Sequence, residues 1–143
     1  MSVFTEAELA YLHEERLARI ATVGGDGQPH ITPVTFHYND DEDAIDIGGI
    51  FFGRTKKWRD GQRNPHVTLL VDDVIGPPRR ARAIEVRGVA ELHETGGEAI
   101  NPRFPNFDPH FFRLRPRRIV AWGIEDDESG TGARFHMNAR SVG

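Results

Sequence analysis

The chain has 143 residues, which suits one domain with a core of ordinary size and is short for two. It carries 22 carboxylates against 18 lysines and arginines, with no long run of like charge, so nucleic acid is not an expected partner. The absence of cysteine excludes disulfides, thiolate metal sites and cysteine nucleophiles. We therefore expect a single domain over residues 1–143 with one kind of site.

The first residues have neither the basic segment nor the apolar segment of a secretion signal. No stretch approaches the roughly 20 apolar residues that a membrane span requires. A cytoplasmic protein without a membrane partner is the resulting expectation.

The N-terminal third predicts a helix and a hairpin. Thr5 and Glu8 have the spacing of a capping box, which predicts a helix over residues 6–15. Residues 17–23 and 29–38 are two β-rich runs on either side of a glycine-rich turn, which is typical of a hairpin.

The second run divides into two faces, because successive strand residues point to opposite sides. Thr32, Val34, Phe36 and Tyr38 share one face, and Ile31, Pro33, Thr35 and His37 share the other. Pro33 cannot donate to a neighbouring strand, so it indicates an edge, a bulge or backbone turned towards a ligand.

Further strands are expected over residues 44–50, 66–71, 82–92 and 118–124, with a two-turn helix capped by Thr55 and ending before Asn64. Residues 95–108 are expected to form a loop, and the apolar residues 111–114 to anchor a short turn. Residues 126–143 are expected to be flexible or docked only through Phe135 and Val142. Strands with short connections and no alternation with helices predict a mainly β protein built as an antiparallel barrel.

The two lysines of the chain, Lys56 and Lys57, are neighbours, whereas the other 16 basic residues are arginines. With Arg54 and Thr55 they lie at the start of the predicted second helix, after Gly48 and Gly49. Amide donors, a hydroxyl and two ammonium groups at a helix N-terminus favour an anion such as phosphate. Chance clustering and an ordinary helix cap with solvated lysines remain the alternatives.

These residues resemble a known family. The run 44–49, the run Thr55-Lys56-Lys57 and the run Asn64-Pro65-His66-Val67 are similar to the phosphate segment of the pyridoxamine 5′-phosphate oxidase-like split β-barrels. Residues 17–23 and 29–35 resemble the first hairpin of that superfamily. More narrowly, the runs 33–34, 45–49, 56–59, 71–73, 85–88 and 117–123 resemble an actinobacterial branch that uses the deazaflavin coenzyme F420. The resemblance spans roughly residues 10–125.

The resemblance implies a cofactor site at the interface of a homodimer. Thr32, Pro33, Val34 and Thr35 would line the ring system, Gly48 and Gly49 would pass close to it, and Thr55, Lys56 and Lys57 would take the phosphate. Arg118 and Trp122 would border the site from the partner subunit. Taken by themselves, Pro33 is also compatible with an edge strand, Trp122 with the core and Arg118 with a solvated strand start.

One departure from the family bears on the cofactor. The flavin-using oxidases carry an arginine and a lysine on the second strand, where this chain has His30 and Thr35. Each lost charge should weaken an FMN phosphate site by about 1.5–3 kcal/mol. The resemblance thus implies an F420-dependent oxidoreductase that reduces a small organic acceptor, with an FMN-dependent enzyme or a non-catalytic flavin, deazaflavin or haem carrier as alternatives.

Other kinds of site have little support. His30 and His37 fall on opposite faces of one strand, and no metal-binding motif accompanies them, so no metal is expected. The serines, Ser2, Ser129 and Ser141, do not occur in a nucleophile motif.

Overall fold

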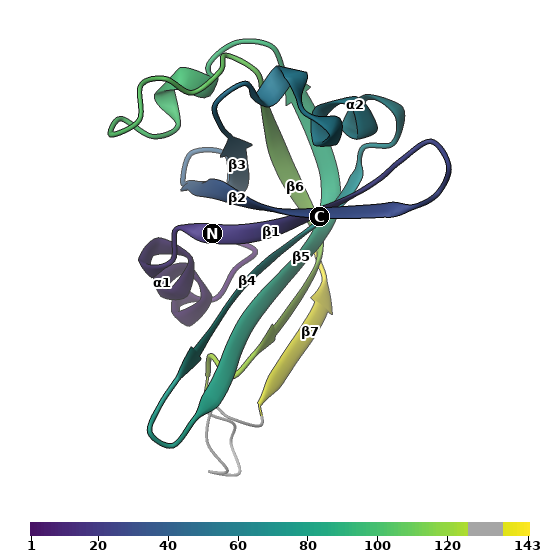
Figure 1. The fold of residues 1–143 in the computed structure, drawn as a ribbon. Helices are drawn as coiled ribbons and strands as arrows, with labels where there is room; N and C mark the ends of the chain where they lie inside the picture. Colours follow the sequence, from purple (N-terminus) through teal and green to yellow (C-terminus); the bar gives the residue numbers. More distant parts are fainter. Residues whose placement is uncertain (126–135) are drawn as a thin grey trace.

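A computed structural model describes residues 1–125 and 136–143. Figure 1 shows two small helices beside a strongly twisted sheet. In chain order the elements are α1 (Glu6–Glu14), β1 (Leu17–Val23), β2 (Pro29–Asn39), β3 (Ala44–Gly48), the 3-10 turn η1 (Phe52–Arg54), α2 (Lys56–Arg63), β4 (His66–Ile75), β5 (Arg80–His93), the 3-10 turn η2 (Gly97–Ala99), β6 (Phe111–Trp122) and β7 (Met137–Ser141). Within the part of the chain described, no helix is long and apolar enough to cross a membrane.

Six antiparallel strands close into a barrel in the order β3-β2-β1-β4-β5-β6, and pairing of β3 with β6 completes it. At this closure the buried Asp46 lies directly opposite Arg113, whose Nε donates to its carboxylate over 2.8 Å. The seventh strand, β7, extends the sheet beyond β6. The predicted mainly β barrel is confirmed.

The barrel core follows the alternation in the sequence. Val34, Phe36 and Tyr38 of β2 are buried, whereas Ile31 and Pro33 on the opposite face are exposed. The predicted hairpin is also present, since β1 pairs with β2 from Leu17 opposite Thr35 to Val23 opposite Pro29. Thr5 and Glu8 form the predicted capping box at the start of α1.

The expectation of a short turn at residues 111–114 is wrong. Phe112 and Leu114 belong to the continuous strand β6, where both side chains are fully buried. Pairing with β5 on one side and β3 on the other satisfies the backbone of this segment, so it has no reason to turn.

The end of the chain also differs from the expected flexible tail. Residues Met137–Ser141 form β7 and pair with β6 from Trp122 to Arg118. Arg140 on this strand donates to the buried Glu8 of α1 at 2.6 and 3.0 Å. The predicted anchor Phe135 lies outside the described residues.

Candidate functional site

The start of α2 is built around Thr55, as the sequence predicts. The hydroxyl of Thr55 accepts from the Trp58 amide at 3.3 Å, and it donates to the Phe52 carbonyl of η1 at 2.7 Å. Thr55 therefore fixes η1 and α2 relative to each other. The positive end of the helix, with its unsatisfied amides, lies at this junction.

The adjacent lysines have different surroundings. The ammonium group of Lys56 contacts both carboxylate oxygens of the buried Asp60, at 3.0 and 2.9 Å. Lys57 instead lies over the Phe52 ring, with Nζ 5.6 Å from the ring centroid, and has no carboxylate partner within residues 1–125 and 136–143. Burial lowers the pKa of Lys57. Lys57 is thus a half-buried cation without a counter-ion, whereas Lys56 is already paired.

The predicted ring-binding segment of β2 contains an unsatisfied hydroxyl. Oγ1 of Thr32 is buried and has no hydrogen-bond partner, the one such side-chain atom among the residues described. Thr32 lies opposite Ile20 of β1, on the face where Thr22 hydrogen-bonds Asp60 of α2. A buried hydroxyl without a partner costs about 1–3 kcal/mol, and a polar group of a ligand beside it would remove that cost.

Pro33 lies in an edge segment, which agrees with one reading of the sequence. Residues 29–34 of β2 pair only with β1, because pairing with β3 begins at Thr35 opposite Gly48. Pro33 and Ile31 are exposed on the outer face of this segment. The buried Val34 faces the core.

The two glycines that end β3 differ in their surroundings. A Cβ on Gly48 would lie 2.9 Å from Cδ1 of Ile100, so the missing side chain makes room for the loop between β5 and β6. The nearest atom to a Cβ on Gly49 would be Cδ2 of Phe52, at 4.0 Å. Gly48 therefore has a packing role without any ligand, while the space beside Gly49 is more open.

The remaining predicted site residues do not join the lysines within one protomer. Arg54 is exposed, with its guanidinium 5.6 Å from the Phe51 ring centroid. Trp58 of α2 stacks on Phe112 near the start of β6, at 5.6 Å between centroids, whereas Trp122 ends that strand about 30 Å further along. Arg118 and Trp122 pair with β5 and β7 in the second half of β6, and no contact joins either of them to Lys57 among the residues described.

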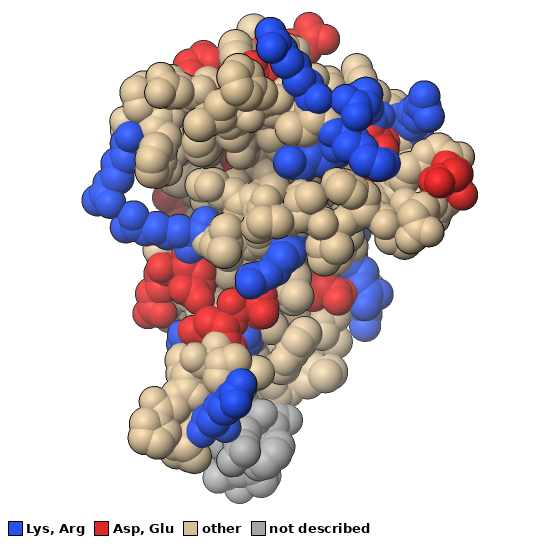
Figure 2. All heavy atoms as spheres, viewed as in Figure 1, with Lys and Arg blue, Asp and Glu red and all other residues tan. Residues whose placement is uncertain are grey.

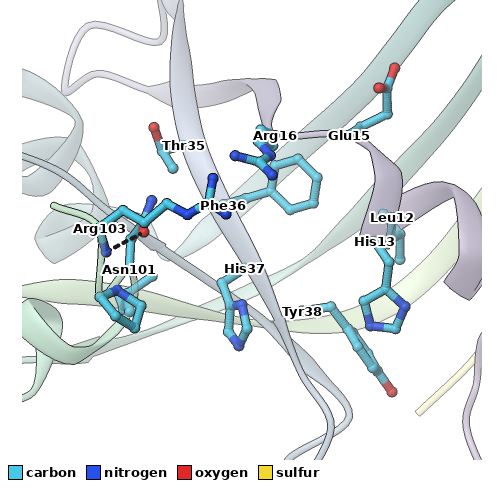
Figure 3. Close-up of a pocket in the computed structure, with 12 residues that line it drawn as sticks. Leu12, His13, Glu15, Arg16, Thr35, Phe36, His37, Tyr38, Asn101 and Arg103 are labelled. Atoms are coloured by element: carbon cyan, nitrogen blue, oxygen red, sulfur yellow. Dashed lines mark hydrogen bonds between the residues drawn. The ribbon is translucent and has the colours of Figure 1, made fainter.

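The sequence did not reveal a groove of about 290 Å³ on the other side of Thr35. Arg16 and Arg103 line it from two sides, and His37 and Tyr38 are among its β2 residues (Figure 3). Basic side chains extend along the left edge of a hollow on the face in Figure 2, and others gather over α2. No periodicity or motif marks the loop residue Arg103, so only the fold identifies this groove.

A second depression, of about 410 Å³, lies beside α2. Lys56, Arg59 and Arg63 line it together with the turn between β1 and β2. No group of three or more metal-ligating side chains occurs in residues 1–125 and 136–143. Asp26 and Asp60 also line the depression beside α2, so its surface carries both signs of charge.

Comparison with known proteins matches residues 4–123 to the family model described as pyridoxamine 5′-phosphate oxidase. A 5a,11a-dehydrotetracycline/5a,11a-dehydrooxytetracycline reductase of Streptomyces rimosus is 41% identical over 133 residues, covering 92% of each chain. An FAD-binding protein of Mesorhizobium loti superposes with a TM-score of 0.62 at 22% identity, over 81% of this chain and 92% of that one. A haem-binding protein of Mycobacterium smegmatis superposes with a TM-score of 0.65 at 17% identity, over 99% of this chain and 60% of that one. These two structures share the fold.

Proposed function

Because the chain belongs to the pyridoxamine 5′-phosphate oxidase family, we propose that it is an oxidoreductase that reduces a small organic acceptor with F420. The similarity to a named reductase over 92% of both chains supports the reductive direction. The single observation that carries the cofactor site is Lys57, a half-buried ammonium group at the start of α2 that has no counter-ion among the residues described. An anionic group of the cofactor would supply the missing charge.

The residues present fit such a group. Lys57 would hold its phosphate, with the first amides of α2 as further donors. Thr55 would position that helix start, because its own hydroxyl already donates to the Phe52 carbonyl. The hydroxyl of Thr32 is the unsatisfied polar atom on the neighbouring strand. Pro33, Thr35 and Gly49 would border the ring. Lys56 is the weakest of the predicted ligands, because its charge is already used by Asp60.

FMN is the alternative cofactor. His30 and Thr35 occupy the positions where the flavin-using relatives are expected to carry permanent charges, and this difference favours F420. A non-catalytic carrier of a flavin, deazaflavin or haem is the alternative from another functional class, since one fold hosts several functions.

The working unit would be a homodimer. Leu17 and Ile31, on the outer face of the β1–β2 hairpin, are 52% and 63% exposed, and the exposed Pro33 lies between them in register. Apolar area of this kind favours a partner surface. A second copy docked there would bring Arg118 and Trp122 towards the cofactor.

When bound, reduced F420 supplies the hydride, so the protein requires no nucleophile of its own. Lys57 and the first amides of α2 would fix the position of the anionic end. Pro33 and Thr35 of β2 would set the orientation of the ring, and Trp122 of the partner subunit would exclude water from the acceptor side.

The test is a fluorescence titration of the full chain with F420 and with FMN. We expect F420 to bind more tightly, and Lys57→Ala to weaken that binding by about tenfold or more, while Lys57→Arg retains most of it. Lys56→Ala is the matched control and should change the F420 affinity by less than about threefold. Tight FMN binding without an F420 response would reject the cofactor, and indifference to Lys57 would reject the phosphate site. Turnover with reduced F420 then distinguishes an enzyme from a carrier.

A further inference from the structure

The groove shown in Figure 3 crosses an open part of the barrel wall. Pairing of β1 with β2 ends at Leu17 opposite Thr35, so β2 residues 36–39 have no strand partner on the β1 side. The last turn of α1 and Arg16 lie on one side of this opening, and residues 100–103 lie on the other. Unpaired backbone groups of an open strand edge are available to a ligand.

The loop that carries Arg103 is held in place by packing and hydrogen bonds. Ile100 sits against the bare backbone of Gly48 and joins Phe107 and Phe111 in a small buried cluster. The Arg103 amide donates to the side chain of Asn101 at 3.0 Å, and the Phe104 amide donates to the Asn101 carbonyl at 2.9 Å. The turn is therefore ordered by contacts of its own.

The two guanidinium groups lack counter-ions. Neither Arg16 nor Arg103 forms an ion pair within residues 1–125 and 136–143, although the chain pairs many of its other arginines. Glu15 also lines the groove, but Figure 3 shows its carboxyl group directed away from both. Figure 3 also shows the Arg103 side chain extending towards Arg16, beside which the Phe36 ring lies. Both side chains are exposed, so water weakens their mutual repulsion, and an anion between them would be attracted by both.

The body of the groove is suited to a flat ring. His13 and His37 line it with exposed side chains, and the largely buried Phe36 and Tyr38 border it from the core. Its volume of about 290 Å³ is near the lower end of the range for small-molecule sites. Thr35, which the proposed function assigns to the cofactor ring, also lines it. The groove therefore begins where the cofactor ring is proposed to end.

We propose that Arg16 and Arg103 clamp a carboxylate or enolate oxygen of a planar organic anion lying in this groove, and that this anion is the acceptor. The assignment of the anion as acceptor rests on the proposed function, whereas anion binding by the two arginines does not. Guanidinium groups suit this role because they remain charged and present paired donors to a carboxylate.

The test uses the fluorescent anion 1-hydroxy-2-naphthoate and its neutral amide, titrated into the full chain without added cofactor. We expect the amide to bind at least about tenfold more weakly than the acid. Arg16→Gln and Arg103→Gln should each weaken binding of the acid by about tenfold. Arg79→Gln, which replaces an exposed arginine in the β4–β5 turn, is the matched control and should leave the affinity for the acid unchanged. Circular dichroism of each variant verifies folding.

Equal binding of acid and amide, or equal affinity in the groove variants and the Arg79 control, would overturn the clamp. The same variants are titrated with F420, and we expect less than a twofold change. If they lose F420 as strongly as naphthoate, the groove serves the anionic part of the cofactor and the acceptor assignment is rejected. If the unaltered chain binds no F420 but retains the naphthoate pattern, the proposed cofactor fails and the clamp stands.

Discussion

The ammonium group of Lys56 lies within 3.0 Å of both carboxylate oxygens of Asp60, one helical turn further along α2. Thr22 of β1 donates to the same carboxylate at 2.9 Å, so the pair ties the helix to the barrel. Burial acts to raise the pKa of Asp60, but the hydrogen bonds from Lys56 and Thr22 and the lysine charge together lower it. Because of this contact, Lys56 has a structural role, whereas its neighbour Lys57 has no carboxylate partner among the residues described.

Lys56→Ala should therefore reduce the free energy of unfolding by about 1–2 kcal/mol, because it leaves a buried carboxylate with Thr22 as its remaining side-chain donor. Urea denaturation at neutral pH measures the change. Lys57→Ala is the comparison, and its effect on stability should be smaller because no carboxylate loses a partner. If the two variants lost the same unfolding free energy, Lys56 would not be the lysine that stabilises the fold.

The sequence predicted the parts of the fold that depend on near neighbours. The Thr5–Glu8 capping box, the Thr55 cap and the β1–β2 hairpin each arise from residues a few positions apart, and all are present. The first half of β6, residues 111–117, and the whole of β7 were missed because their partners are distant. β6 takes one partner from β3 and another from β5, and Arg140 of β7 reaches Glu8 near the other end of the chain.

Part of the candidate site could be predicted from residues that are close in the sequence. Lys56 and Asp60 are four residues apart on one helix, and this spacing predicts that Lys56 is paired. The placement of Arg103 and Arg16 on the same groove could not be predicted from the sequence. It depends on Ile100 packing against Gly48, which only the closed barrel brings together.

Arg140→Met should destabilise the protein by about 3 kcal/mol. The side chain of Glu8 is fully buried, and Arg140 provides its charged partner at 2.6 Å, so removal leaves an unpaired carboxylate in the core. The variant should also loosen β7, which amide hydrogen exchange of residues 137–141 would report. Arg117→Met, at an exposed position on β6, is the control and should change stability by less than about 0.5 kcal/mol. A similar small change in Arg140→Met would show that Glu8 is solvated.

Gly48→Ala should displace the loop between β5 and β6. The new Cβ would lie 2.9 Å from Ile100, whose side-chain end must shift, at a cost of about 1 kcal/mol in unfolding free energy. Because Ile100 positions Arg103, naphthoate affinity should fall as well. Gly49→Ala is the matched control, since its Cβ would approach no atom closer than 4.0 Å. Identical behaviour of the two variants in thermal unfolding and in naphthoate titration would refute this role for Gly48.

The free energy of unfolding should depend on pH through one cluster, which consists of Asp73, Arg82, Tyr11 and Glu15. The hydrogen bond from Arg82, aided by one from Tyr11, lowers the pKa of Asp73 against the opposing effect of burial. Asp73 therefore stabilises the fold above about pH 4, the ordinary aspartate range, and this contribution disappears as pH falls through its lower folded pKa. Glu15 acts in the opposite direction, because burial, followed by the charge of Asp73, raises its pKa.

Asp73→Asn tests this balance directly. The variant should lose about 1–2 kcal/mol at pH 7, where Asp73 is ionised and paired, and less at pH 3, where the unaltered protein has lost part of the same contribution. Urea denaturation from pH 3 to pH 7 measures both curves, with Asp41→Asn in the exposed β2–β3 turn as the control. Because the Asn side chain carries no charge, the pKa of Glu15 should also return towards its ordinary value, which side-chain NMR titration can follow. A stability difference that stays constant across this pH range would mean that Asp73 acts through packing and not through its charge.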